Sequence, residues 1–133
     1  MARTLGKYEV EFMIDVTGET TGEPFKGKFA CKTRLSHNDH LRRDQVRRAL
    51  LGVAPGAPDA RADSAAEIFS QLAVRLVDAP SWWTMAENGK ELYDDKPVAA
   101  VYDAAMKAER DAVAAVTAKG EEAKGDLPEL KEQ

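Results

Sequence analysis

Two alternating stretches near the N-terminus constrain the fold most. From Tyr8 to Val16, apolar and polar side chains alternate strictly, with Tyr8, Val10, Phe12, Ile14 and Val16 on one face and Glu9, Glu11, Met13 and Asp15 on the other. From Phe25 to Leu35 the same period places Phe25, Gly27, Phe29, Cys31, Thr33 and Leu35 on one face and Lys26, Lys28, Lys32 and Arg34 on the other. A period of two is typical of half-buried strands, and residues 17–24 between them are rich in turn formers. The sequence therefore predicts a β-hairpin over residues 8–35.

The predicted hairpin carries acids on the outer face of its first strand and bases on that of its second. Antiparallel pairing brings these charges opposite each other, which stabilises the pair. Two strands alone are marginally stable in water, and we find no third strand in the sequence to cover either edge. An uncovered edge tends to acquire a neighbour. We therefore expect the hairpin to add to a sheet of another subunit, either a copy of this chain or a different protein.

Two helices are expected after the hairpin. Ser36, with Asp39 three residues later, is typical of a helix N-cap, and Gly52 is a suitable end for that helix. Asp59 can cap a second helix, which Pro80 should stop. The apolar side chains of the second helix repeat at helical spacing and comprise Ala65, Ile68, Phe69, Leu72, Leu76 and Val77.

The C-terminal part of the chain predicts a third main helix. Asp94 or Asp95 can cap it, with Pro97 in the first turn, and Gly120 is expected to end it. Residues 121–133 are charged and predict a tail that is mobile unless a partner orders it. The expected architecture is a single α+β domain over residues 1–120, with the hairpin at 8–35, a helical part at 36–119, and the charged tail at 121–133.

Composition restricts the class of protein. With 133 residues, the chain is long enough for one domain with a modest core. No apolar stretch approaches the roughly 20 residues that span a bilayer, and the first residues do not resemble a secretory signal. Cys31 is the only cysteine, which fits a reducing cytoplasm. We expect a soluble cytoplasmic protein with no membrane partner.

Positive charge is concentrated in one segment. The net charge of the chain is −4, yet residues 24–53 hold eight basic side chains against Asp39 and Asp44. One interpretation is that Arg43, Arg47 and their neighbours pair with acids on other helices or subunits. The alternative is a small nucleic-acid-binding protein that uses the basic segment 26–48. We favour the first, because the whole chain is acidic and no aromatic residue lies among the arginines.

Residues that could carry chemistry have simpler explanations. His37 and His40 lack a third ligand for zinc, and Cys31 lies on a strand that should point it into the core. The glycine and lysine spacing of residues 22–28 resembles a phosphate-binding loop but leads into a strand rather than a helix. Asp94 and Asp95 suit a helix cap. We expect no enzymatic activity, no catalytic residues, no metal and no cofactor.

Adjacent tryptophans follow Pro80 on a short turn or helix. The side chains of Trp82 and Trp83 diverge, so we expect one to pack beneath the hairpin and the other to be exposed or in an interface, where tryptophan is enriched. The alternative is that both cover the core. The residues expected to contact a partner are Trp82, Trp83, Arg43, Arg47, Lys26, Lys28, Leu127 and Leu130.

Several short motifs carry a family resemblance. They comprise residues 66–69, the stretch Leu76-Val77-Asp78-Ala79-Pro80-Ser81-Trp82-Trp83, Gly89, residues 92–95 and residues 98–102. Together they make residues 8–110 similar to small morphogenesis proteins of tailed bacteriophages, which are often described as tail assembly chaperones or minor virion structural proteins. The resemblance implies a non-catalytic role in assembly, with viral protein subunits as partners, in the cytoplasm of an infected bacterial host or in the virion.

Overall fold

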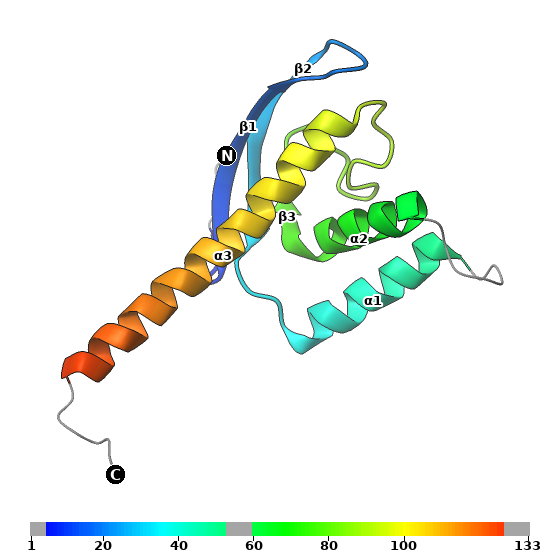
Figure 1. The fold of residues 1–133 in the computed structure, drawn as a ribbon. Coiled ribbons are helices and arrows are strands. Elements are labelled where there is room, and N and C mark those ends of the chain that lie inside the picture. The colour runs from blue at the N-terminus through cyan, green and yellow to red at the C-terminus, as the bar shows by residue number, and fades with distance from the viewer. Residues whose placement is uncertain (1–4, 53–59, 127–133) are drawn as a thin grey trace.

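The chain folds as an α+β protein with an N-terminal β-hairpin packed on helices, as the sequence predicts. The computed structural model describes residues 5–52 and 60–126. In chain order the elements are β1 (Glu9–Thr17), β2 (Pro24–Lys32), α1 (His37–Leu51), α2 (Ala60–Arg75), β3 (Leu76–Asp78) and α3 (Asp95–Asp126). The long helix α3 lies against the sheet, and α2 lies between α1 and the N-terminal half of α3 (Figure 1).

The hairpin forms with the expected alternation. β1 and β2 pair antiparallel in one register, from Glu9 opposite Lys32 to Thr17 opposite Pro24. Beyond the strand ends, the Thr33 N–H donates to the Tyr8 carbonyl at 2.7 Å, which continues the ladder. On the inner face, Phe29 is fully buried and stacks on Phe12 with ring centroids 5.5 Å apart.

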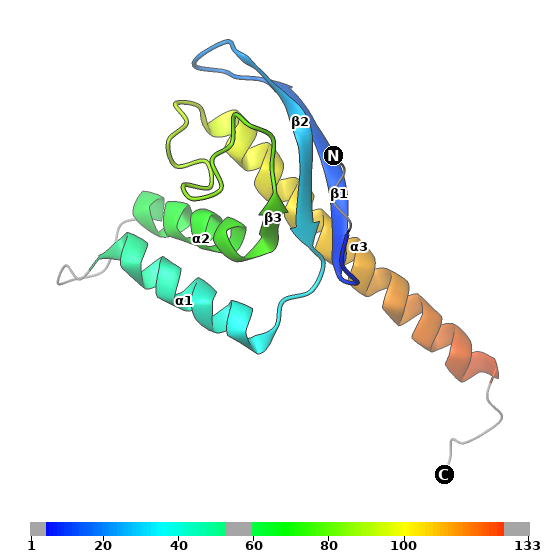
Figure 2. The same ribbon diagram turned by 180° about the vertical axis from the view of Figure 1, so that it is seen from behind.

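The expectation that no third strand covers the hairpin was wrong. β3 pairs antiparallel with β2, with Cys31 opposite Leu76. The second helix ends at Arg75, so Leu76 and Val77 leave it and continue as strand instead of extending its apolar stripe. Leu76 is buried in the core there. The strand order β1-β2-β3 makes β2 the central strand and leaves β1 at an edge (Figure 2).

The core lies between the sheet and the helices. Its buried residues come from both strands of the hairpin, from α2, β3 and α3, and from the tryptophan turn. They are Ile14, Phe29, Cys31, Leu72, Leu76, Trp83, Val98, Val101 and Ala105. The rings of Trp83 and Phe29 pack edge-on, with their centroids 5.3 Å apart. A side chain at Gly89 would lie 2.7 Å from the Trp83 ring, and Gly89 has φ 90°, so a glycine is required there.

The two middle helices differ in how they are held. α1 begins with the predicted Ser36–Asp39 capping box and ends at Gly52, but it contains no buried residue. α2 is enclosed more deeply, and its buried face differs from the predicted stripe: Ala65 is exposed, whereas Ala66 and Val74 are buried. The difference arises because α2 packs against α1 on one side, and on the other its Leu72 joins a core cluster with residues of the sheet and α3.

α3 is longer than the sequence predicts. It runs through Gly120 to Asp126, so the expectation that Gly120 ends it was wrong. A glycine inside a helix costs about 1 kcal/mol relative to alanine, which weakens a helix without stopping it. The C-terminal half of α3 extends away from the rest of the structure (Figures 1 and 2). Asp59, Leu127 and Leu130 lie outside the described residues.

Candidate protein-interaction site

The outer edge of β1 is the main candidate for a binding site. Within residues 5–52 and 60–126, the sheet has no strand beyond β1. Because Tyr8 pairs by hydrogen bond with Thr33, antiparallel alternation turns the backbone groups of Phe12 and Ile14 toward β2. The same alternation turns the N–H and C=O groups of Glu11 and Met13 outward, along the open edge.

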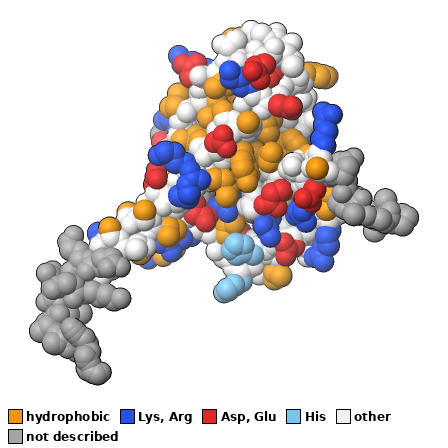
Figure 3. All heavy atoms as spheres, viewed as in Figure 1, with side chains coloured by type: hydrophobic (Ala, Val, Ile, Leu, Met, Phe, Trp, Pro, Cys, Tyr) orange, Lys and Arg blue, Asp and Glu red, His pale blue; other side chains and the backbone are white. Residues whose placement is uncertain are grey.

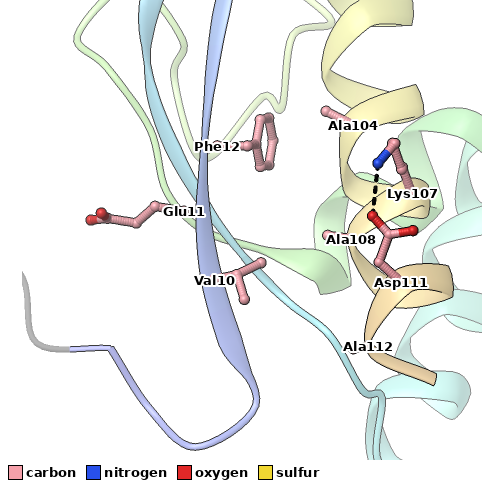
Figure 4. A pocket seen from close by; sticks show the side chains of 8 residues that line it. All are labelled: Val10, Glu11, Phe12, Ala104, Lys107, Ala108, Asp111 and Ala112. Carbon is pink, nitrogen blue, oxygen red and sulfur yellow. Dashed lines mark hydrogen bonds and ion pairs between the residues drawn. The ribbon is translucent and has the colours of Figure 1, made fainter. Parts of the chain in front are cut away.

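An apolar groove lies beside this edge. It has a volume of about 490 Å³ and is lined by Val10, Glu11 and Phe12 of β1 and by Ala104, Lys107, Ala108, Asp111 and Ala112 of α3. Val10 and Phe12 point toward α3, whereas Glu11 points away (Figure 4). The alanines recur every four residues and so share one helix face, and their small side chains leave the space open. Lys107 and Asp111 form an ion pair at 2.7 Å on the same stretch of α3.

The outer face of the sheet is charged. Lys28 lies 3.6 Å from Glu11 across the hairpin, and Lys26 lies opposite Asp15 in the register. This is the predicted pairing of acids with bases, and it places both candidate lysines on the exposed face of β2. Between Glu11 and Asp15, Met13 is 58% exposed. β1 therefore presents an acidic outer face with an apolar centre.

Arg43 and Arg47 hold α1 on α2. Arg47 pairs with Asp63 and lies 3.3 Å from Glu67, and Arg43 lies 3.7 Å from the same glutamate. These ion pairs lie within the fold, between two helices of one chain. They confirm the pairing with acids of a neighbouring helix for Arg43 and Arg47, whereas Arg42 donates to the backbone carbonyl of Ala73.

The tryptophan pair lies in the fold rather than on its surface. Trp83 is 2% exposed and belongs to the core, so it is not accessible to a partner. Trp82 is half-buried, and its indole N–H donates to the Lys26 carbonyl at 2.9 Å. Its ring also packs against Phe25 and Phe29. The alternative in which both tryptophans cover the core describes this arrangement best.

Asp94 joins two distant parts of the chain. Its carboxylate accepts the N–H of Lys96 in the first turn of α3, which confirms the predicted cap, and also the N–H groups of Thr20 and Thr21 in the hairpin loop. Burial alone would raise the pKa of Asp94, but these backbone donors outweigh it and hold the pKa well below its usual range. Asp94 is therefore ionised at neutral pH and serves the fold.

Cys31 is buried, as the alternation predicts. Burial raises the pKa of its thiol to about 11, against the opposing charge of Arg75. The thiol is thus protonated at neutral pH and a poor nucleophile. Arg75 itself is buried and donates a hydrogen bond to Gln71 within α2. Its ion pair with Glu109 joins α2 to α3. In the described part of the chain, no group of three or more His, Cys, Asp and Glu residues could hold a metal ion.

A second apolar groove lies between α2 and α3. It has a volume of about 330 Å³ and is lined by Arg61, Ala65, Ile68, Phe69, Asp95, Val98 and Ala99. Apolar side chains gather in the middle of this face, over α2 and α3 (Figure 3). Sequence reasoning missed both grooves. The alanine spacing of α3 indicates a helix face of small side chains. Only the position of α3 in the fold shows that this face lies beside β1 and forms the groove.

Comparison of the chain with protein-family models, with curated proteins and with solved structures returned no match. Among the described residues, no helix has the length and apolar character needed to cross a bilayer.

Proposed function

We propose that this protein is a non-enzymatic assembly or virion structural protein of a tailed bacteriophage, which binds other viral protein subunits through the β1 edge. It would act in the cytoplasm of an infected bacterial host or in the virion. The observation that carries this proposal is the coincidence of an open strand edge with an apolar groove beside it. The phage context rests on the resemblance of the motifs between residues 66 and 102.

An open edge and an adjacent groove supply the two parts of a strand-addition site. Outward N–H and C=O groups of Glu11 and Met13 can bond the backbone of a guest strand. Side chains of that strand that point to the inner face would enter the groove between Val10, Phe12 and α3. Backbone bonds then supply affinity, and the shape of the groove supplies selectivity.

The alternative of nucleic-acid binding by segment 26–48 is weakened by its ion pairs. Arg43 and Arg47 face acids of α2, and Lys32 lies 3.0 Å from Asp39. Each such pairing competes with a phosphate for the cation. The observed contacts therefore favour protein subunits as partners.

A backbone variant of β1 tests the proposal. Met13→Pro removes an N–H that faces outward and leaves the β1–β2 bonds in place, so the fold should tolerate it at an edge strand. Met13→Thr keeps this N–H and serves as the matched control. Each tagged protein is purified from cells that also express the structural proteins of the phage that encodes it.

A defined viral subunit should co-purify in stoichiometric amount with the unaltered protein and with Met13→Thr, but not with folded Met13→Pro. Mass spectrometry of purified virions then separates a retained component from a chaperone. Failure of every viral subunit to bind, or tight and steeply salt-dependent binding to DNA or RNA instead, contradicts the proposal.

A further inference from the structure

The charges along β1 restrict which strand its edge can accept. The outer-face side chains of β1 include Glu9, Glu11 and Asp15 and no base. A strand added at the edge would place alternate side chains next to these acids on the same face of the sheet. Opposite charges at such cross-strand positions are favourable and like charges are unfavourable. A guest strand with lysine or arginine on this face is therefore favoured.

The structure contains an example of such a pairing on the other side of β1. β2 places Lys26 and Lys28 on the same outer face, opposite Asp15 and Met13 in the register. Its inner face carries Phe25 and Phe29, both buried. β1 thus already accepts one strand in which apolar and basic residues alternate.

A second copy of this chain does not meet the requirement. Antiparallel pairing of two β1 strands keeps the outer faces on one side of the joined sheet. With Met13 opposite Met13 of the second copy, Glu11 of each chain lies opposite Asp15 of the other. Like charges directly opposite each other destabilise a sheet. The charge pattern therefore favours a different protein as the partner.

The groove defines the other face of the guest strand. Side chains that point inward would contact Val10, Phe12 and the alanine face of α3 at Ala108 and Ala112. The space of about 490 Å³ accommodates aliphatic or aromatic side chains. Because small residues of α3 line the groove, large side chains of the added strand would fill it.

We propose that the β1 edge binds an extended segment of a different protein in which apolar residues alternate with lysine or arginine. The apolar side chains enter the groove between β1 and α3, and the basic ones pair with Glu11 and Asp15. This inference rests on the proposed function, because it names the chemistry of the partner at the same edge.

Synthetic peptides test the charge rule. The probe is a peptide as long as β1, nine residues, in which valine alternates with lysine. One control replaces lysine with glutamate, and a second has the same composition in blocked rather than alternating order. The second control is needed because the whole chain is acidic, with a net charge of −4, and attracts any cationic peptide. Affinity is measured by fluorescence anisotropy, and edge protection by residue-resolved hydrogen exchange.

The alternating lysine peptide should bind about tenfold more tightly than either control. This is the change in affinity expected when the free energies of a few cross-strand charge pairs are added. It should slow exchange of the Glu11 and Met13 amides. Ala112→Trp, which fills the groove, should weaken binding, whereas Ala114→Trp, on the opposite face of α3, should not. Met13→Pro should abolish protection of the edge.

The outcomes that overturn the inference differ from those that overturn the proposed function. Equal binding of the glutamate or blocked peptide overturns the charge rule, as does failure of all three peptides to protect the edge. A homodimer with protected β1 amides overturns the choice of a different protein. In each case the co-purification of viral subunits, and its loss in Met13→Pro, still decides the proposed function by itself.

Discussion

The side-chain carboxylate of Asp94 accepts a hydrogen bond from the backbone N–H of Thr21, 73 positions earlier in the chain, at 3.1 Å. The same side chain caps α3 through the N–H of Lys96. One carboxylate therefore fixes the hairpin loop to the start of the helix that lines the groove.

Asp94→Ala should lower the free energy of unfolding, because it removes the cap of α3 and leaves the N–H groups of Thr20 and Thr21 without this acceptor. Urea denaturation measures the change. The matched control is Asp95→Ala, since Asp95 is exposed in the next position. Equal effects of the two substitutions would contradict the role assigned to Asp94.

The contribution of Asp94 should depend on pH. Because the pKa of Asp94 is lower in the folded state than its unfolded value near 3.9, ionised Asp94 stabilises the fold above about pH 4. This stabilisation is lost as the pH falls through the lower, folded-state pKa. The difference in unfolding free energy between the unaltered protein and Asp94→Ala should therefore be constant near neutral pH and shrink in strong acid. A difference that persists unchanged in strong acid would rule out this linkage.

Leu72→Ala should cost about 2–5 kcal/mol of unfolding free energy, since Leu72 is fully buried in the core. Leu41, by contrast, is 61% exposed on α1, so Leu41→Ala should change stability by no more than about 0.5 kcal/mol. Chemical denaturation of both variants provides the comparison. A small effect at Leu72 would show that α2 is peripheral.

Arg47→Glu should loosen α1 from α2, because it places a third acid next to Asp63 and Glu67. Amides of α1 should exchange faster while those of β2 stay unchanged, since α1 contributes no buried residue to the core. Arg48→Glu, an exposed change on the same helix, is the control. If the two variants exchange alike, the ion pairs with α2 do not hold α1 in place.

The parts of the fold that the sequence predicts are those determined locally. The hairpin follows from strict alternation between Tyr8 and Val16, and the first helix from its capping box at Ser36 and its end at Gly52. β3 could not be found this way, because Leu76 and Val77 fit both a helical stripe and a strand. Pairing with Cys31, a contact between distant residues, decides between the two.

The candidate site was predicted only in part. Alternation indicates a strand with an exposed edge, but it cannot show that β3 covers β2 and leaves β1 open. The groove depends on where α3 crosses the sheet. The spacing of Ala104, Ala108 and Ala112 predicts a shared helix face but not the position of that helix on the sheet. Trp83 is an interface candidate in the sequence because tryptophan is enriched in interfaces, whereas packing against Phe29 buries it.

The most direct test of the central claim is residue-resolved hydrogen exchange along β1, with and without the co-purified viral subunit. Amides alternate along the strand, so Phe12 and Ile14, which face β2, should exchange slowly in both states and act as an internal reference. Glu11, Met13 and Asp15, which face outward, should exchange fast in the free monomer and slowly in the complex. Slow exchange of the outward amides in a proven monomer, or no change on binding, would contradict the account.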